Sequence, residues 1–207
     1  RYKTKKIHDI KQQKLNGMKK STIAEKIRTN LLILFNYKLI MSLWFVLIAG
    51  VLSSQTVTQL NQQISTMLSS SDPAVVAEGQ HLQSLVSDLH PTLIIQNGEF
   101  IQYGGDFSVK TECGLASLND LYQQDEAFAP VVMIQIKIQS EQDLQTMVNL
   151  NALTGFPQLK YLFFLCDFDP CSQSSQNQSC EQEIFAAMVQ GTGTEGLKVI
   201  YKVSVPM

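Results

Sequence analysis

Basic residues are scarce in most of this chain. Of its 207 residues, 16 are Lys or Arg, and 11 of these lie in positions 1–40 beside only two acids, a net charge of +9. Positions 41–207 hold five Lys, no Arg and 16 acids, a net −11. A surface that follows a phosphate backbone needs clustered Lys and Arg. We therefore expect no nucleic-acid partner. The uneven distribution of charge along the chain predicts two parts that have separate fates or work in different environments.

Common catalytic signatures are also absent. The chain has no Gly-x-Ser-x-Gly, His-Glu-x-x-His or Ser-x-x-Lys motif, which weakens the commonest hydrolase interpretations. The glycine-rich GTGTEG at 191–196 precedes a strand instead of following one, so it does not predict a phosphate-binding loop. His81 and His90 lack partners at metal-ligand spacing, and we expect them to be exposed or locally hydrogen-bonded. No cofactor and no catalytic residue is assigned.

The four cysteines include no Cys-x-x-Cys pair. Cys166, Cys171 and Cys180 fall within sixteen residues, and Cys113 stands apart. Zinc sites and thioredoxin-like redox motifs usually need closer pairs, so we favour disulfides and keep zinc and redox chemistry as alternatives. Four cysteines allow three pairings that the sequence cannot separate. Our preferred set is Cys171 with Cys180 and Cys113 with Cys166, the alternative being that Cys113 and Cys166 are buried thiols.

An apolar run follows the basic segment. We interpret 1–40 as a basic leader; because the chain begins with Arg1, this leader either precedes the true start or belongs to a fragment. Residues 41–54 have the ten-residue apolar core of a signal peptide. A retained membrane anchor over 31–52, with the costly Lys38 inside it, and a buried helix are the alternatives. We expect a secreted, periplasmic or cell-envelope protein that contacts a membrane only through this segment, if it is uncleaved.

Apolar spacing predicts a helical hairpin over 55–90. Apolar residues from Val57 to Leu68 recur mostly at intervals of three and four, typical of an amphipathic helix. Asp72 is suited to cap a second helix and Pro73 to occupy its first position.

The remaining segment, 91–207, is expected to form one α/β domain. Asn97-Gly98 predicts a turn between strands near 92–96 and 99–103, and residues 107–113 alternate as a third strand. Ser140 and Asp143 resemble a capping box that opens a helix. The later segments alternate in the order VVMIQIKIQ (strand), the helix opened by Ser140, QLKYLFFLC (strand), CEQEIFAAMVQG (helix) and LKVIYKVSV (strand).

These elements predict an α/β (α+β) fold. It consists of a small mixed sheet with a C-terminal parallel β-α-β-α-β unit, an N-terminal β-hairpin and a preceding helical hairpin.

Two acids, Asp167 and Asp169, follow the second strand of the parallel unit. Parallel sheets bind ligands beyond the carboxyl ends of their strands, and two such carboxylates suit Ca²⁺ or acid–base chemistry. The alternating ligand pattern of a calcium loop is missing. We name both acids only as candidates, and a solvated acidic loop is the alternative.

The layout from LIIQNGEFIQYGGDF through ECGLASLNDLYQQD to VIYKVSVPM resembles small exported proteins of unknown function in Bacteroidetes-type bacteria. The resemblance covers about 41–207 and implies export without implying an activity. LNALTGFPQLKYLFFL also reads like one leucine-rich repeat, but no second copy follows at a constant period, which disfavours a solenoid.

Two functional hypotheses follow. The first is an exported non-enzymatic binding or structural domain of unknown ligand and partner. The second is an extracytoplasmic hydrolase or cation-dependent enzyme with a site at Asp167 and Asp169. The two differ in whether these carboxylates converge with other polar groups.

Overall fold

The computed structural model describes residues 56–172 and 178–204. The basic leader at 1–40 and the signal or anchor segment at 41–54 lie outside the described residues, so both remain predictions. Within the described ranges, no helix is long and apolar enough to cross a membrane.

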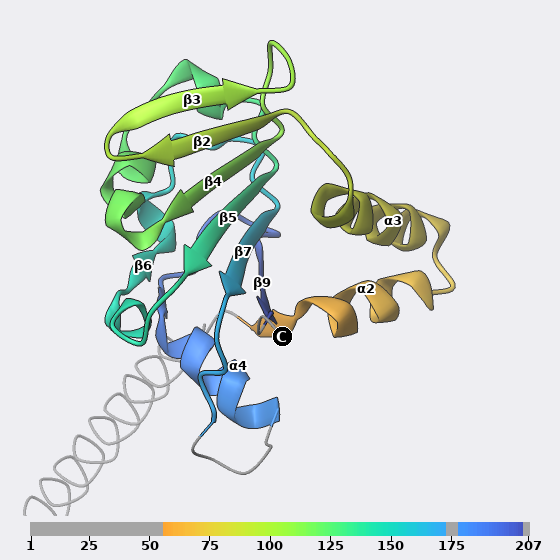
Figure 1. The fold of residues 1–207 in the computed structure, drawn as a ribbon. Helices are drawn as coiled ribbons and strands as arrows, with labels where there is room; N and C mark the ends of the chain where they lie inside the picture. Colours follow the sequence, from red (N-terminus) through yellow and green to blue (C-terminus); the bar gives the residue numbers. More distant parts are fainter. Residues whose placement is uncertain (1–55, 173–177, 205–207) are drawn as a thin grey trace, which may run out of the picture. The chain divides into compact units, whose positions relative to one another are not determined.

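Seven strands form one sheet, in the order β1-β9-β7-β5-β4-β2-β3 (Figure 1). All neighbouring pairs are parallel except β2 and β3, which are antiparallel. The predicted mixed α/β class is therefore confirmed. The strands are β1 (Val57–Gln59), β2 (Thr92–Gln96), β3 (Glu99–Tyr103), β4 (Lys110–Gly114), β5 (Met133–Ile138), β7 (Tyr161–Cys166) and β9 (Lys198–Val203).

The predicted hairpin joins β2 to β3. Gln96 pairs with Glu99 across a two-residue turn, and both turn residues have positive φ, 54° at Asn97 and 77° at Gly98. Asn and Gly tolerate this left-handed region best, which is why the pair predicts the turn.

From β4 to β9 the chain adds one parallel strand to the sheet at each winding. Lys110, Met133, Tyr161 and Lys198 occupy equivalent positions in successive strands, at separations of 23, 28 and 37 residues. Solenoids wind in this way, but here the windings differ in length. This difference accounts for the missing sequence period.

The helix predicted to open at Ser140 is not formed. The Asp143 carboxylate accepts backbone N–H bonds from Gln139 (2.8 Å) and Ser140 (3.0 Å). It thus closes a tight turn on the preceding residues. The segment then continues as three short elements, η3 (Asp143–Gln145), β6 (Val148–Asn149) and η4 (Leu150–Ala152). The backbone of β6 pairs with β8 (Val189–Gln190) in a second, two-stranded sheet.

The connections between strands pack together on one face of the sheet. Here η1 (Leu115–Tyr122) and η2 (Glu126–Phe128) link β4 to β5, and α4 (Gln178–Ala187) precedes β8. The α4 helix confirms the second helix of the predicted unit. Stacked ring pairs, Phe128 with Phe156 at 4.4 Å and Phe185 with Tyr201 at 4.6 Å, fill this core.

Helices α2 (Leu60–Leu68) and α3 (Pro73–Ser87) form the predicted helical hairpin and pack on the other face (Figure 1). As expected, Asp72 caps α3 by accepting from the Ala74 N–H at 2.8 Å. The buried strand residues that meet these helices come from β5, β7 and β9 and are Met133, Tyr161, Phe163 and Ile200.

Candidate functional site

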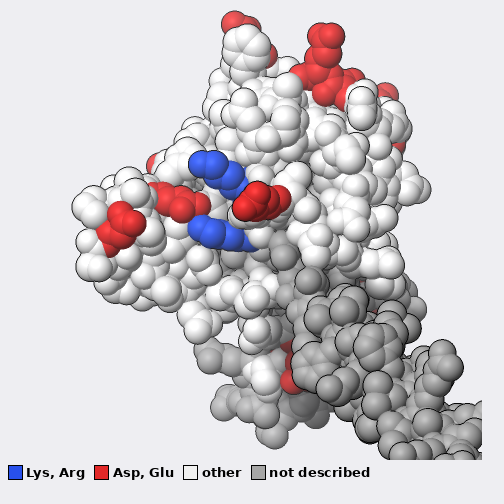
Figure 2. Space-filling view, turned by 180° about the vertical axis from the view of Figure 1, so that it is seen from behind, with Lys and Arg blue, Asp and Glu red and all other residues white. Residues whose placement is uncertain are grey.

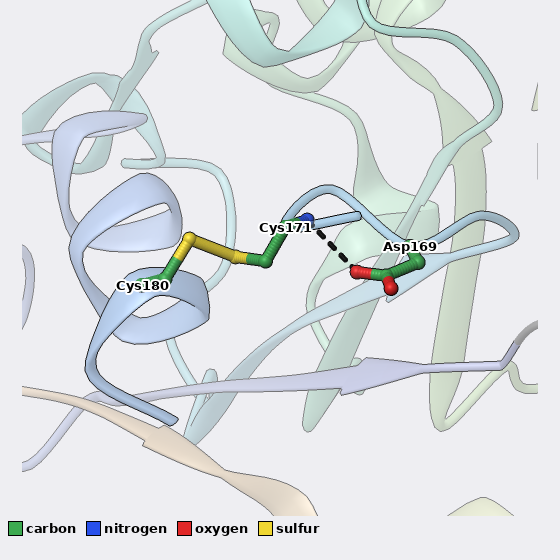
Figure 3. Close-up of a disulfide and its surroundings, with 3 residues drawn as sticks. All are labelled: Asp169, Cys171 and Cys180. Carbon is green, nitrogen blue, oxygen red and sulfur yellow. Dashed lines mark hydrogen bonds between the residues drawn. A yellow bond between two sulfur atoms is a disulfide. The ribbon is translucent and has the colours of Figure 1, made fainter. Parts of the chain in front are cut away.

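The cysteine-rich loop after β7 carries one disulfide, between Cys171 and Cys180 (Figure 3). Their Cα atoms are 6.3 Å apart, within the range that a disulfide spans. The bridge joins the end of the β7 loop to the first turns of α4, and it confirms this half of the preferred pairing.

The expected bridge between Cys113 and Cys166 is not formed, and both are buried free thiols. Cys113 lies on β4 and Cys166 on β7, with β5 between them. Two strand spacings of about 4.8 Å place the cysteines beyond the reach of a disulfide. Burial, with smaller effects of Asp120 and Glu112, raises the pKa of Cys113 to about 12. Both thiols thus lack the exposed thiolate character of a reactive cysteine.

The candidate acids Asp167 and Asp169 do not converge with other acids, histidines or cysteines on a metal site within the described ranges. Asp169 accepts the backbone N–H of Cys171 at 2.8 Å and so shapes the turn before the disulfide (Figure 3). The Asp167 backbone N–H donates to the Ile138 carbonyl at 3.0 Å. Across the described ranges, no three His, Cys, Asp or Glu side chains are placed to hold a metal ion. The arrangement matches the solvated acidic loop.

The histidines have local roles, as expected. His81 is exposed. The His90 ring Nε2 lies 3.0 Å from the Ser84 carbonyl and 3.1 Å from its hydroxyl.

A cleft of 310 Å³ lies at the carboxyl ends of β2, β4 and β5. This is the edge at which parallel sheets bind ligands. The polar residues that line it are Gln96, Asn97, Glu112, Ser117, Lys137 and Gln139.

Glu112, the acid of this cleft, is held in ion pairs. Its carboxylate lies 2.8 Å from Lys110 Nζ and 3.1 Å from Lys137 Nζ. Burial acts to raise the pKa of Glu112, but hydrogen bonds and charge from the two lysines outweigh burial and lower it. The group therefore stays ionised near neutral pH, and its geometry is that of a structural ion pair instead of a general acid.

The outer part of the β2–β3 hairpin is a second candidate. Phe100 lies on one face of β3, with its ring centroid 5.8 Å from that of Phe128, and Ile101 and Tyr103 lie on the other face. Phe100, Ile101, Tyr103 and Phe107 are 39%, 37%, 56% and 74% exposed, and we call them the hairpin patch. The described residues contain three other exposed large apolar side chains, Leu68, Leu89 and Met147, which are scattered along the chain. The hairpin patch is thus a concentration of exposed apolar surface within eight residues.

Strand β3 is also an open edge. In an antiparallel pair closed by a two-residue turn, Gln96 and Glu99 exchange hydrogen bonds, and the pattern alternates from there. The N–H and C=O groups of Phe100 and Gln102 therefore point away from β2. No strand and no other backbone segment of the described residues hydrogen-bonds to β3 on that side.

Sequence reasoning missed this surface. Apolar residues on both faces of β3, at 100, 101 and 103, are an ordinary sign of a buried strand. Only the strand order shows that β3 is an edge. One sequence signal of an edge strand was available. The short hairpin is followed by Gly104-Gly105, and these two glycines permit the chain to leave the sheet after β3.

Comparisons with known proteins give no relative: no family model, no curated protein and no solved structure matches this chain. The resemblance to exported bacterial proteins therefore stays a prediction. The function has to be inferred from the geometry of the cleft, the disulfide and the hairpin patch.

Proposed function

We propose that this chain is an exported, non-enzymatic binding domain that contacts a protein partner through β3 and the hairpin patch. The observation that carries the proposal is the coincidence of exposed apolar side chains with a strand edge that has no neighbour in the part of the chain that the structure describes. Clustered apolar surface of this kind typically marks an interaction site.

The edge has few of the features that keep strands from pairing. Soluble proteins protect such edges with Lys, Pro, bulges or a covering helix. Among the described residues, β3 has no Lys, no Pro, no bulge and no covering helix: its residues are Glu99, Phe100, Ile101, Gln102 and Tyr103, of which Glu99 alone is charged, and its pairing with β2 is continuous. An extended segment that adds to β3 would gain backbone hydrogen bonds and would cover the apolar side chains together.

The disulfide supports the proposal that the protein works outside the reducing cytosol. Bridges such as Cys171–Cys180 persist in secreted, periplasmic and cell-surface proteins and are rare in the cytosol. Intact-mass spectrometry of the natively expressed protein, with and without reduction, tests this. We expect one disulfide and an N-terminus near Gln55 for a cleaved signal; all four thiols free on a cytosolic chain would contradict export.

The distribution of charge also fits a protein partner better than nucleic acid. Three of the five lysines in positions 41–207, Lys110, Lys137 and Lys198, are ion-paired. On the face in Figure 2, basic side chains occupy one small area beside acidic ones, and much of the described surface is uncharged. A phosphate-binding surface needs a broader basic area.

The binding proposal is tested by co-purification of the natively produced full chain. We expect a partner to be retained by the unchanged protein and lost with Tyr103→Lys plus Phe107→Ser. Met147→Lys, which changes an exposed apolar residue elsewhere, is the matched control and should retain the partner. Equal retention by both variants would contradict a role for the hairpin patch.

The enzyme alternative has its own test. If Asp167→Asn with Asp169→Asn abolished a turnover activity of the folded protein, the non-enzymatic assignment would be wrong.

A further inference from the structure

We propose that the strand that pairs with β3 is β3 of a second copy of this chain, in antiparallel register about Ile101. This inference rests on the proposed function and names its partner. The result is a continuous sheet across a two-fold axis, a closed arrangement in which each copy offers the same surface.

The register follows from the backbone groups that β3 leaves unused. Phe100 and Gln102 carry the outward N–H and C=O groups. In a two-fold pairing about Ile101, Phe100 of each copy lies opposite Gln102 of the other. The outward N–H and C=O groups of these two residues can then hydrogen-bond to each other. A shift by one residue would set Phe100 against Ile101, whose backbone groups already bond to Ile94 of β2. Among the registers that are allowed, only the one about Ile101 pairs all five residues.

The side chains of β3 are compatible with their own copies in this register. Ile101 faces Ile101 of the second copy, and Ile94 lies beside Ile101 in the β2–β3 register. An apolar row therefore runs across four strands, which stabilises cross-strand pairing. Glu99, the one charged residue of β3, lies opposite Tyr103 of the second copy and not opposite another Glu99.

Glycines lie at both ends of the paired strands. In the same register, Gly98 and Gly104 lie opposite each other. A Cβ added to Gly98 would meet no atom of its own chain within 4 Å. The Gln102 side-chain amide donates to the carbonyl of Gly105 of its own chain, which keeps that side chain directed along its own strand.

Variants that introduce a charge at the two-fold axis test the inference. In Ile101→Lys, or in Ile101→Glu, each new charge faces the same charge in the second copy. We expect either variant alone to weaken self-association by about tenfold or more, because facing like charges are strongly unfavourable. An equal mixture of the two variants should restore association, because Lys then faces Glu. Sedimentation velocity of the full chain, from micromolar to submillimolar concentration, measures all four samples.

The outcomes separate this inference from the proposed function. Rescue in the mixture also shows that each variant is folded, and Met147→Lys should associate like the unchanged chain. Self-pairing would be overturned if Ile101→Lys and Ile101→Glu left association unchanged. It would also be overturned if the unchanged chain stayed monomeric at every concentration. If the chain is monomeric but Tyr103→Lys plus Phe107→Ser still loses a co-purifying protein, only the identity of the partner is wrong. If neither self-association nor partner loss occurs, the proposed function fails as well.

Discussion

Successive residues of β4 have opposite surroundings because strand side chains alternate between the two faces of a sheet. Thr111 and Cys113 point into the core beneath the connections, whereas Lys110 and Glu112 form an ion pair on the other face. The alternation of residues 107–113 was readable from the sequence. The partners of these residues were not readable, because they depend on which strands lie on either side.

Thr111→Val should stabilise the protein. Thr111 is fully buried, and its Oγ1 has no hydrogen-bond partner among the described residues. A buried polar atom without a partner costs about 1–3 kcal/mol, and Val keeps the shape of the side chain. We expect the free energy of unfolding in urea to rise by about 1 kcal/mol. Thr111→Ala, which also opens a cavity, is the control; a loss of stability in Thr111→Val would show that the hydroxyl is satisfied.

Glu112 should make stability depend on acid pH. Lys110 and Lys137 hold its pKa below the ordinary 4.5. Its contribution to stability is therefore present above pH 4.5 and is lost as the pH falls from there through the folded-state pKa. Glu112→Gln should reduce this acid-dependent loss, measured as urea unfolding at a series of pH values. Glu183→Gln, an exposed acid with no ion pair among the described residues, is the matched control. An unchanged pH slope in Glu112→Gln would contradict the ion pair.

Elements that are determined by residues nearby in the sequence were predictable, and elements that depend on residues far along the chain were not. Asn97-Gly98 determines its turn by its own φ preferences, and Asp72-Pro73 begins α3 in the same local way. The segment after Ser140 has a helical pattern, yet β6 takes its backbone partner from β8, about 40 residues further along the chain. No local pattern reveals such a pairing. The exposed state of β3 was missed for the same reason.

Gly98→Ala tests the turn of the hairpin. The backbone φ of Gly98 is 77°, where a Cβ costs about 1 kcal/mol, so we expect a destabilisation of about that size in urea unfolding. Gly114→Ala is the control, because Gly114 has an extended backbone (φ −91°, ψ 167°) and open space for a Cβ. Equal effects of the two substitutions would contradict the left-handed turn.

Reduction of the Cys171–Cys180 bridge should destabilise the protein. The bridge closes a loop with a sequence separation of 9, and loop closure on this scale is worth about 2–3 kcal/mol through the unfolded chain. We expect Cys171→Ser with Cys180→Ser to lower the free energy of unfolding by about this amount and to abolish its sensitivity to reductant. Reductant sensitivity that persists in the double variant would place the bridge elsewhere.

In the molecule as a whole, the mixed sheet was predictable from the succession of strands, while its order required the structure. The windings from β4 to β9 differ in length, so no sequence period reveals them. Their order determines that β1 and β3 are the two edges. It also separates Cys113 on β4 from Cys166 on β7, because β5 lies between them. The proposed contact surface thus arises from the order of the strands, and the candidate acid Asp169 shapes the turn before the disulfide.

Amide hydrogen exchange at β3 tests the central claim most directly. The Phe100 and Gln102 N–H groups point to the open edge, so they should exchange rapidly in a dilute, isolated chain. When the natively purified protein is bound to its partner, or is concentrated enough to self-pair, we predict that exchange slows at these two amides and that the amides of β5 are unchanged. Equally rapid exchange at Phe100 and Gln102 in the free and bound protein would contradict the assignment of β3 as the contact surface.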